Sequence, residues 1–270
     1  MKKLFLLFCL VALTLGIKAQ NQVTLRDVSK GTYRASNIYG IKPMLDGQYY
    51  TQISPDRKRI VKYSFKTGKQ VEAIFDVEKA RDCTLKYFDD YIMSPDEKLI
   101  LIQTKTRSIY RRSFTAEYYI YNVKNNTIEP LSKNGPQQVP LFSPDGFQVA
   151  FVRNNNIFLV KLLFGNSESQ ITKDGEYNKV LNGIPDWVYE EEFGFNRAFD
   201  FSADSKMIAY IRFDESQVPM YKFPLYKGMN PEYTEFATYP GEYTYKYPKS
   251  GEVNSTVSVH TYDIKSHVTR

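Results

Sequence analysis

The sequence predicts an all-β protein built from repeated antiparallel sheets, and two observations lead to this expectation. The chain of 270 residues holds 22 Tyr and 18 Phe among frequent Gly and Pro, a composition that favours strands separated by turns. A turn of the type Ser-Pro-Asp also recurs, and each copy precedes an apolar run. The hydrophobic share of 42% and the charged share of 24% are ordinary for a globular protein.

Residues 1–20 are expected to be a signal peptide, and residues 21–270 the folded part. Lys2 and Lys3 give a basic start, residues 4–15 form an apolar stretch, and a plausible cleavage region follows. The stretch is too short to span a bilayer, although a retained anchor is the alternative. We therefore expect an exported protein, either periplasmic or at the cell surface or secreted. Loss of the segment lowers the net charge from +6 to +3, too small an excess to suggest nucleic-acid binding.

The four copies of the turn begin at Ser54, Ser94, Ser143 and Ser202, with intervals of 40, 49 and 59 residues. Proline fixes φ in the first three copies, the fourth copy has Ala203 in its place, and the aspartate bonds its own backbone in all four, so each copy is expected to close a β-hairpin. A period near 40–50 residues with several strands per unit is typical of the blades of a β-propeller. Such turns occur in other β proteins too, but four copies before four strands favour the propeller.

An acidic segment lies between the third and fourth copies, where residues 187–192 read Trp-Val-Tyr-Glu-Glu-Glu. One interpretation is an acidic first helical turn, with Asp186 as N-cap and the glutamates near the positive end of the helix dipole. The other is a receptor for a cation that carries several hydrogen-bond donors. Two carboxylates about 100° apart on one turn can approach a single ammonium from two sides.

A long segment rich in Tyr, Pro and Gly follows the fourth copy, between residues 213 and 253. Loops of this length in compact domains are usually functional. Residues 221–247 contain seven tyrosines, a residue type enriched at protein interfaces. We expect a two-stranded arm that leaves the blade beginning near Phe201. The alternative is an arm folded back onto its own propeller.

From about Arg34 to its last residue the chain resembles the dipeptidyl peptidase IV family of serine exopeptidases. The resemblance is strongest at residues 110–116, 182–192, 213–219 and 247–254. It implies that Glu191 and Glu192 bind the free amino terminus of a peptide substrate, and that Arg111 binds a carbonyl of the bound dipeptide. Glu190 matches a position outside this pair, so its substitution is expected to matter less for cleavage.

The resemblance also implies an eight-bladed propeller joined to a C-terminal α/β-hydrolase domain, whose nucleophile sits on a G-x-S-x-G turn. These 270 residues contain no such motif, and their only histidines are His260 and His267. We therefore expect an incomplete propeller of about four to five four-stranded blades, without the catalytic domain and inactive alone. We expect no catalytic residue, cofactor or metal in this chain.

The resemblance implies the substrate-recognition portion of an enzyme that releases Xaa-Pro or Xaa-Ala dipeptides from free peptide amino termini. It further implies a homodimer in the complete enzyme, joined through the arm at residues 221–247. Two alternatives stay open: a non-catalytic exported propeller that binds peptides or protein partners, and a cell-envelope scaffold with no peptide site. The glutamates together with Arg111 favour the first two functions over the scaffold.

Overall fold

The computed structural model describes residues 22–35, 39–229 and 232–270, so the expected signal peptide lies outside the described residues. The chain divides into two units, Met1–Gly40 and Ile41–Arg270. In the first unit, α2 (Leu25–Lys30) begins with a capping box in which Thr24 and Asp27 bond each other's backbone N–H groups. Among the described residues, no helix is long and apolar enough to cross a membrane.

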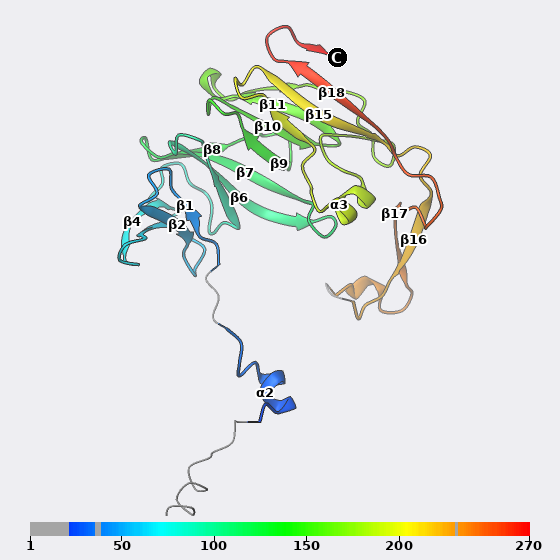
Figure 1. Cartoon of the computed structure of the whole chain (residues 1–270), viewed down its shortest axis with the longest axis horizontal. Helices are drawn as coiled ribbons and strands as arrows, with labels where there is room; N and C mark the ends of the chain where they lie inside the picture. The colour runs from blue at the N-terminus through cyan, green and yellow to red at the C-terminus, as the bar shows by residue number, and fades with distance from the viewer. Residues whose placement is uncertain (1–21, 36–38, 230–231) are drawn as a thin grey trace, which may run out of the picture. The chain divides into compact units, whose positions relative to one another are not determined.

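The second unit contains three antiparallel sheets of four strands each (Figure 1). The first sheet holds β1 (Lys42–Pro43), β2 (Tyr49–Ile53), β3 (Arg59–Ser64) and β4 (Gln70–Asp76). The second holds β5 (Asp90–Met93), β6 (Leu99–Ser108), β7 (Phe114–Asn122) and β8 (Thr127–Pro130). The third holds β9 (Gln138–Phe142), β10 (Gln148–Arg153), β11 (Asn156–Lys161) and β12 (Ser167–Gln170), with a 3-10 turn at Leu162–Phe164 before β12.

The fourth sheet has five strands and two insertions. Its strands are β13 (Val180–Asn182), β14 (Phe199–Phe201), β15 (Met207–Asp214), β18 (Thr256–Asp263) and β19 (Val268–Thr269). Both β13 and β14 pair with β15, at Asn182 opposite Arg212 and at Phe199 opposite Tyr210. The first strand of this blade is therefore split, and α3 (Trp187–Phe193) emerges from the gap.

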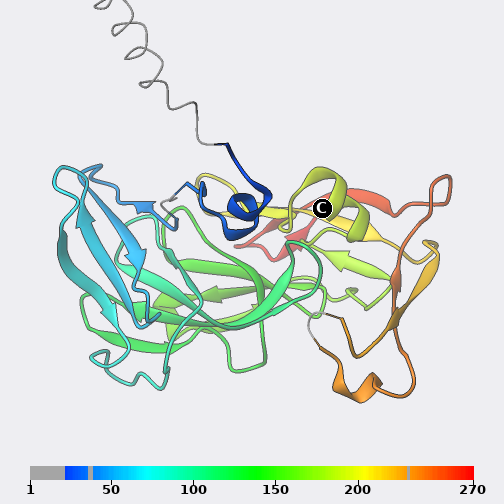
Figure 2. The ribbon, with the colours of Figure 1, turned by 90° about the horizontal axis from the view of Figure 1, so that it is seen from below.

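The expected arm is present as a separate two-stranded sheet between β15 and β18. It consists of β16 (Met220–Leu225) and β17 (Gly241–Lys246), with a 3-10 turn at Thr234–Phe236 between them. It extends from the fourth sheet in both views (Figures 1 and 2). The insertion that contains α3 lies between the third and fourth copies of the turn repeat and explains why their interval is the longest, whereas the arm follows the fourth copy.

The turn repeat has the predicted structure in all four copies. At Ser94, the hydroxyl donates to Asp96 Oδ1 at 2.8 Å and accepts from the Leu99 N–H at 3.0 Å. The serines of the other three copies make the same two contacts. The turns close the hairpins β2–β3, β5–β6, β9–β10 and β14–β15, so the repeat marks equivalent places in the four blades.

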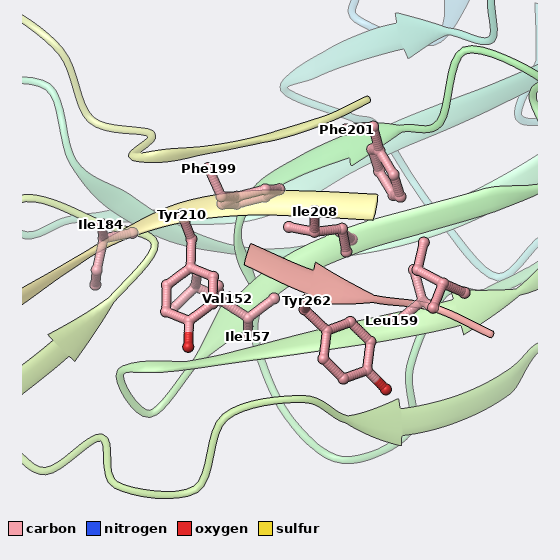
Figure 3. Close-up of a cluster of buried hydrophobic side chains, with 11 residues drawn as sticks. Val152, Ile157, Leu159, Ile184, Phe199, Phe201, Ile208, Tyr210 and Tyr262 are labelled. Carbon is pink, nitrogen blue, oxygen red and sulfur yellow. The ribbon is translucent and has the colours of Figure 1, made fainter. Parts of the chain in front are cut away.

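Alternate residues on the central strands join neighbouring sheets into one stack. On β6, Ile100 packs in a cluster shared with the first sheet, whereas Leu101 packs in one shared with the third. On β10, Phe151 contributes to the cluster with the second sheet, and Val152 to the cluster with the fourth, which Figure 3 shows. Successive strand residues point to opposite faces, so each inner sheet is buried on both sides. These four blades confirm the predicted incomplete propeller.

Candidate functional site

Helix α3 is defined by a cap at each end. The Asp186 carboxylate accepts from the Tyr189 N–H at 2.9 Å, and its other oxygen accepts from the Ser255 hydroxyl. Gly194 ends the helix with φ of 73°, a left-handed conformation that suits glycine, and its N–H donates to the Glu190 carbonyl at 3.1 Å. The acidic helical turn capped by Asp186 is therefore confirmed.

The three consecutive glutamates of α3 lie in three different environments. Successive helical residues are about 100° apart around the axis, so adjacent side chains face different directions. Glu190 is 1% exposed, the Glu191 side chain is 18% exposed, and Glu192 lies on the surface. The triplet is therefore not one acidic patch but three carboxylates in separate surroundings.

Glu190 attaches the β6–β7 loop to α3. Its Oε1 accepts from the Arg112 N–H at 2.6 Å and from the Ser113 N–H at 2.9 Å. Asn196, just beyond the helix, donates to the Arg112 carbonyl at 2.9 Å. The second oxygen of Glu190 is buried with no hydrogen-bond partner among the described residues, an arrangement that costs free energy unless the other contacts offset it. Burial thus gives Glu190 a structural role that the sequence did not indicate.

Arg111, at the tip of this loop, meets Glu191 across 80 residues of sequence. Its Nε donates to the two carboxylate oxygens at 2.8 and 3.0 Å. The Arg111 side chain is 68% exposed, and within the described part of the chain its terminal guanidinium nitrogens have no hydrogen-bond partner. Glu192 has no hydrogen-bond or ion-pair partner there either. The structure therefore joins Arg111 to Glu191 and leaves Glu192 open to solvent beside them.

Aromatic residues at the root of the arm contact both α3 and the β6–β7 loop that carries Arg111. The ring of Tyr247 lies 4.4 Å from that of Trp187 on α3, and Tyr245 lies 5.3 Å from Tyr110, which precedes Arg111. Burial, and then the nearby Tyr243 and Glu215, raise the pKa of Tyr110, so it stays a neutral phenol. The tyrosines of residues 221–247 predicted a protein interface. The contacts of Tyr245 and Tyr247 within their own chain became visible only in the structure.

The tip of the arm differs from its root. Tyr239 is 79% exposed, and Tyr226 and Met229 are exposed as well. Figure 1 shows the arm continuing beyond α3. Both interpretations of the arm therefore hold in part: the root packs on its own propeller and the tip projects.

The candidate site consists of hydrogen-bond acceptors, the carboxylates of Glu191 and Glu192, and of one donor group, the guanidinium of Arg111. His260 and His267 bond Ser258 and Tyr262 within or beside β18. No group of three or more His, Cys, Asp or Glu residues suited to a metal ion occurs in residues 22–35, 39–229 and 232–270. Around Arg111 and Glu191 the chain thus presents carboxylates that can accept hydrogen bonds and a guanidinium that can donate them.

Comparison with known proteins identifies the family. The sequence model described as "Dipeptidyl peptidase IV (DPP IV) N-terminal region" matches residues 94–270. The chain belongs to the dipeptidyl peptidase IV family. The predicted resemblance is thus confirmed, for the N-terminal region of the family.

Relatives and a solved structure agree with this assignment. The chain is 39% identical over 181 residues to "Probable dipeptidyl-aminopeptidase B" of Talaromyces stipitatus, and the match covers 64% of this chain and 20% of that protein. It is 31% identical over 243 residues to the human "Prolyl endopeptidase FAP", covering 89% of the chain and 30% of that protein. The crystal structure of Porphyromonas gingivalis dipeptidyl peptidase 4 is similar with a TM-score of 0.82 and 44% identity, over 94% of this chain and 35% of that one. The chain therefore spans about a fifth to a third of the length of these relatives.

Proposed function

We propose that the chain is the substrate-recognition portion of a dipeptidyl peptidase IV-like serine exopeptidase and binds the free amino terminus of a peptide. Membership of the family and the contact between Arg111 and Glu191 support the proposal. In this assignment Glu191 and Glu192 accept hydrogen bonds from the ammonium, and Arg111 donates to a carbonyl of the bound dipeptide.

The geometry suits this division of roles. Arg111 contacts Glu191 through Nε alone, so its two terminal nitrogens point to no other described group and can donate to a substrate carbonyl. The same contact fixes the Glu191 carboxylate in place, whereas Glu192, the next residue of the helix, keeps its oxygens free of partners among the described residues. A peptide α-ammonium has a pKa near 8 and is largely charged at neutral pH. An acylated amine lacks that charge, so the site selects by rejection as well as by attraction.

Hydrolysis itself is assigned to a part of the enzyme that these 270 residues do not contain. They hold no G-x-S-x-G motif, and this chain covers about a fifth to a third of its relatives. Release of Xaa-Pro or Xaa-Ala dipeptides is accordingly proposed for the complete enzyme, and this chain alone is proposed to bind without cleaving.

We also propose that the protein acts outside the cytoplasm, in the periplasm or at the cell surface. The basic start at Lys2 and Lys3 followed by apolar residues 4–15 supports export. Mass spectrometry of the native protein should find an amino terminus near residue 21. Recovery of the chain with residues 1–20 intact would contradict signal cleavage.

Peptide binding tests the amino-terminal site directly. Ala-Pro-Phe amide and its N-acetylated form are titrated into the chain by calorimetry. The free amine should bind, and acetylation should remove binding. Loss of one partner of a desolvated charge pair costs about 2–5 kcal/mol, so Glu191→Gln should weaken binding by at least about 30-fold. Glu192→Gln should weaken it less, because the Glu192 carboxylate is exposed in this chain.

Glu129→Gln is the matched control, because Glu129 is an exposed acid on β8 with no ion pair among the described residues. It should leave binding unchanged. Since one relative is named a prolyl endopeptidase, equal binding of the acetylated peptide would favour recognition of internal chain segments and would contradict the free-terminus assignment.

A further inference from the structure

A cavity of about 480 Å³ lies beside the proposed amino-terminal site of Arg111, Glu191 and Glu192, called the α3 site below, but it is lined by a different set of residues. Its apolar wall consists of Ile109, Pro136, Leu181, Ile184 and Pro185. Neither Arg111 nor Glu191 nor Glu192 lines it. The volume is in the range of small-molecule sites, and the rest of the lining is largely polar.

Glu215 is the unusual group in this wall. It follows directly after β15, in one of the segments singled out by the sequence, and it is only 6% exposed. Its N–H donates to the Lys179 carbonyl at 2.8 Å, yet its carboxylate has neither a hydrogen bond nor an ion pair among the described residues. A buried carboxylate without a partner is costly, so a partner that enters the cavity would relieve that cost.

The charges near Glu215 do not neutralise it. The buried Asp186 lines the same cavity, and Asp214 is adjacent in sequence. Lys246 is the nearby cation, but its Nζ donates to the carbonyls of Ser216 and Val218 at 3.2 and 2.7 Å. Burial first, and then Asp186, raise the pKa of Glu215 to about 7.

Arg153 and Glu176, which also line the cavity, already have ion-pair partners. Arg153 forms an ion pair with Glu168, and Glu176 forms one with Lys179 at 2.6 Å. Tyr110, also in the lining, is a neutral phenol for the reason given above. Two buried acids of the lining, Asp186 and Glu215, therefore have no ion pair, but Asp186 accepts hydrogen bonds from Tyr189 and Ser255, so Glu215 is the one whose carboxylate has no partner among the described residues.

We propose that this cavity binds a small organic cation, a primary ammonium carried on a short apolar body, with Glu215 as its counter-ion. The apolar wall accommodates the body of the ligand, and Glu215 accepts hydrogen bonds from the ammonium. A divalent metal is a poorer match, because Ca²⁺ needs six to eight oxygen ligands and Glu215 is the only acid of the cavity without a partner. The site is separate from the proposed amino-terminal site and does not depend on it.

The test compares cyclohexylmethylammonium with the uncharged cyclohexylmethanol, which has the same body. Both are titrated into the full chain by ligand-observed NMR at pH 6 and pH 8. The amine should bind and the alcohol should not. With a pKa of about 7, the ionised fraction of Glu215 is about tenfold larger at pH 8 than at pH 6, so the amine should bind about tenfold more tightly at pH 8.

Glu215→Gln should weaken amine binding at pH 8 at least about tenfold and remove the pH dependence. Glu176→Gln is the matched control, because it removes an exposed carboxylate from the same lining, and it should leave binding unchanged. Thermal unfolding confirms that both variants fold. Equal binding of amine and alcohol, tighter binding at pH 6, or unchanged affinity in the folded Glu215→Gln variant would overturn the proposal.

Glu191→Gln separates the two sites. It should weaken binding of Ala-Pro-Phe amide and leave cyclohexylmethylammonium unaffected. Parallel loss of both ligands in this variant would show that the amine probe occupies the α3 site, which would overturn the second site while leaving the proposed function intact.

Discussion

The third and fourth sheets are built on the same hairpin turn, yet they differ in what interrupts them. In the third sheet, β9 to β12 follow one another with short connections. In the fourth, α3 divides the first strand, and the arm separates β15 from β18. Arg111 is added from the extended β6–β7 hairpin of the second sheet. The regular blade is packed on both faces, and the interrupted blade carries Glu191 and Glu192, the carboxylates proposed to bind the amino terminus.

The largest expected effect falls in the regular part. Phe151 is fully buried between the second and third sheets and stacks on Phe158 with ring centroids 5.6 Å apart. Phe151→Ala should lower the free energy of unfolding by about 3–5 kcal/mol, because it removes a large apolar side chain and leaves a cavity. Urea unfolding followed by circular dichroism measures this change. A loss below 1 kcal/mol would show that the sheets do not depend on this interface.

Glu215 makes the stability of the interrupted blade depend on pH. Its folded-state pKa of about 7 lies above the ordinary value of 4.5, so the folded chain binds more protons between these values. Stability should therefore fall as pH rises from about 4.5 to about 7, by up to about 3 kcal/mol, and stay level above that range. Unfolding measured at pH 5 and pH 8 gives the difference, which Glu215→Gln should reduce.

Substitution of Glu190 tests whether this one residue joins the second and fourth sheets beside α3. Glu190→Ala leaves the amides of Arg112 and Ser113 without their acceptor, and it should cost about 1–3 kcal/mol. Hydrogen exchange of those two amides should accelerate, whereas Glu192→Ala should change neither stability nor exchange. Unchanged protection at residues 112 and 113 would mean that the loop is held by Asn196 and Arg111 alone.

The sequence predicted the regular part better than the interrupted part, for a physical reason. Each copy of the turn is specified by five or six adjacent residues, and the strands that follow, such as β6 and β10, are continuous apolar runs that the sequence shows directly. The split into β13 and β14 leaves two strands of three residues, too short to show a period. The burial of Glu190 depends on a loop 77–78 residues earlier in the chain, which helical periodicity alone cannot reveal.

The candidate site, like the fold, could be predicted from the sequence only where its features are local. The acidic turn and its cap at Asp186 are local features, and the sequence indicated them. Which of three adjacent glutamates packs inward, and which meets Arg111, is decided by the position of the β6–β7 loop. Glu215 was noted only within a matching segment, because nothing in its local pattern shows that it is buried beside a cavity.

A smaller effect is expected from the turn repeat itself. Ser94→Ala removes one hydroxyl that both donates to Asp96 and accepts from Leu99, and it should cost about 1 kcal/mol. Ser202→Ala removes the equivalent contacts in the fourth blade, where the serine is less buried, and it should cost less. Paired unfolding curves measure the two losses. A larger loss at Ser202 would show that the interrupted blade relies more on its turn than the regular blades do.

A substitution at the tip of the arm should affect the association of subunits rather than the stability of the fold. Its root is fixed by Tyr245 and Tyr247 against Tyr110 and Trp187, but Tyr239 near its tip is 79% exposed. We propose that the tip joins two copies of the complete enzyme, because exposed aromatic side chains on a projecting element are typical of protein interfaces. Tyr239→Ser should change the free energy of unfolding by less than about 0.5 kcal/mol while weakening the dimer of the complete enzyme in light scattering. Tyr247→Ser, at the root, should instead disturb the α3 site and reduce peptide binding. A dimer that is unaffected by Tyr239→Ser and by loss of the exposed tip would assign subunit contact to another surface, and the arm would then serve only to support the recognition face.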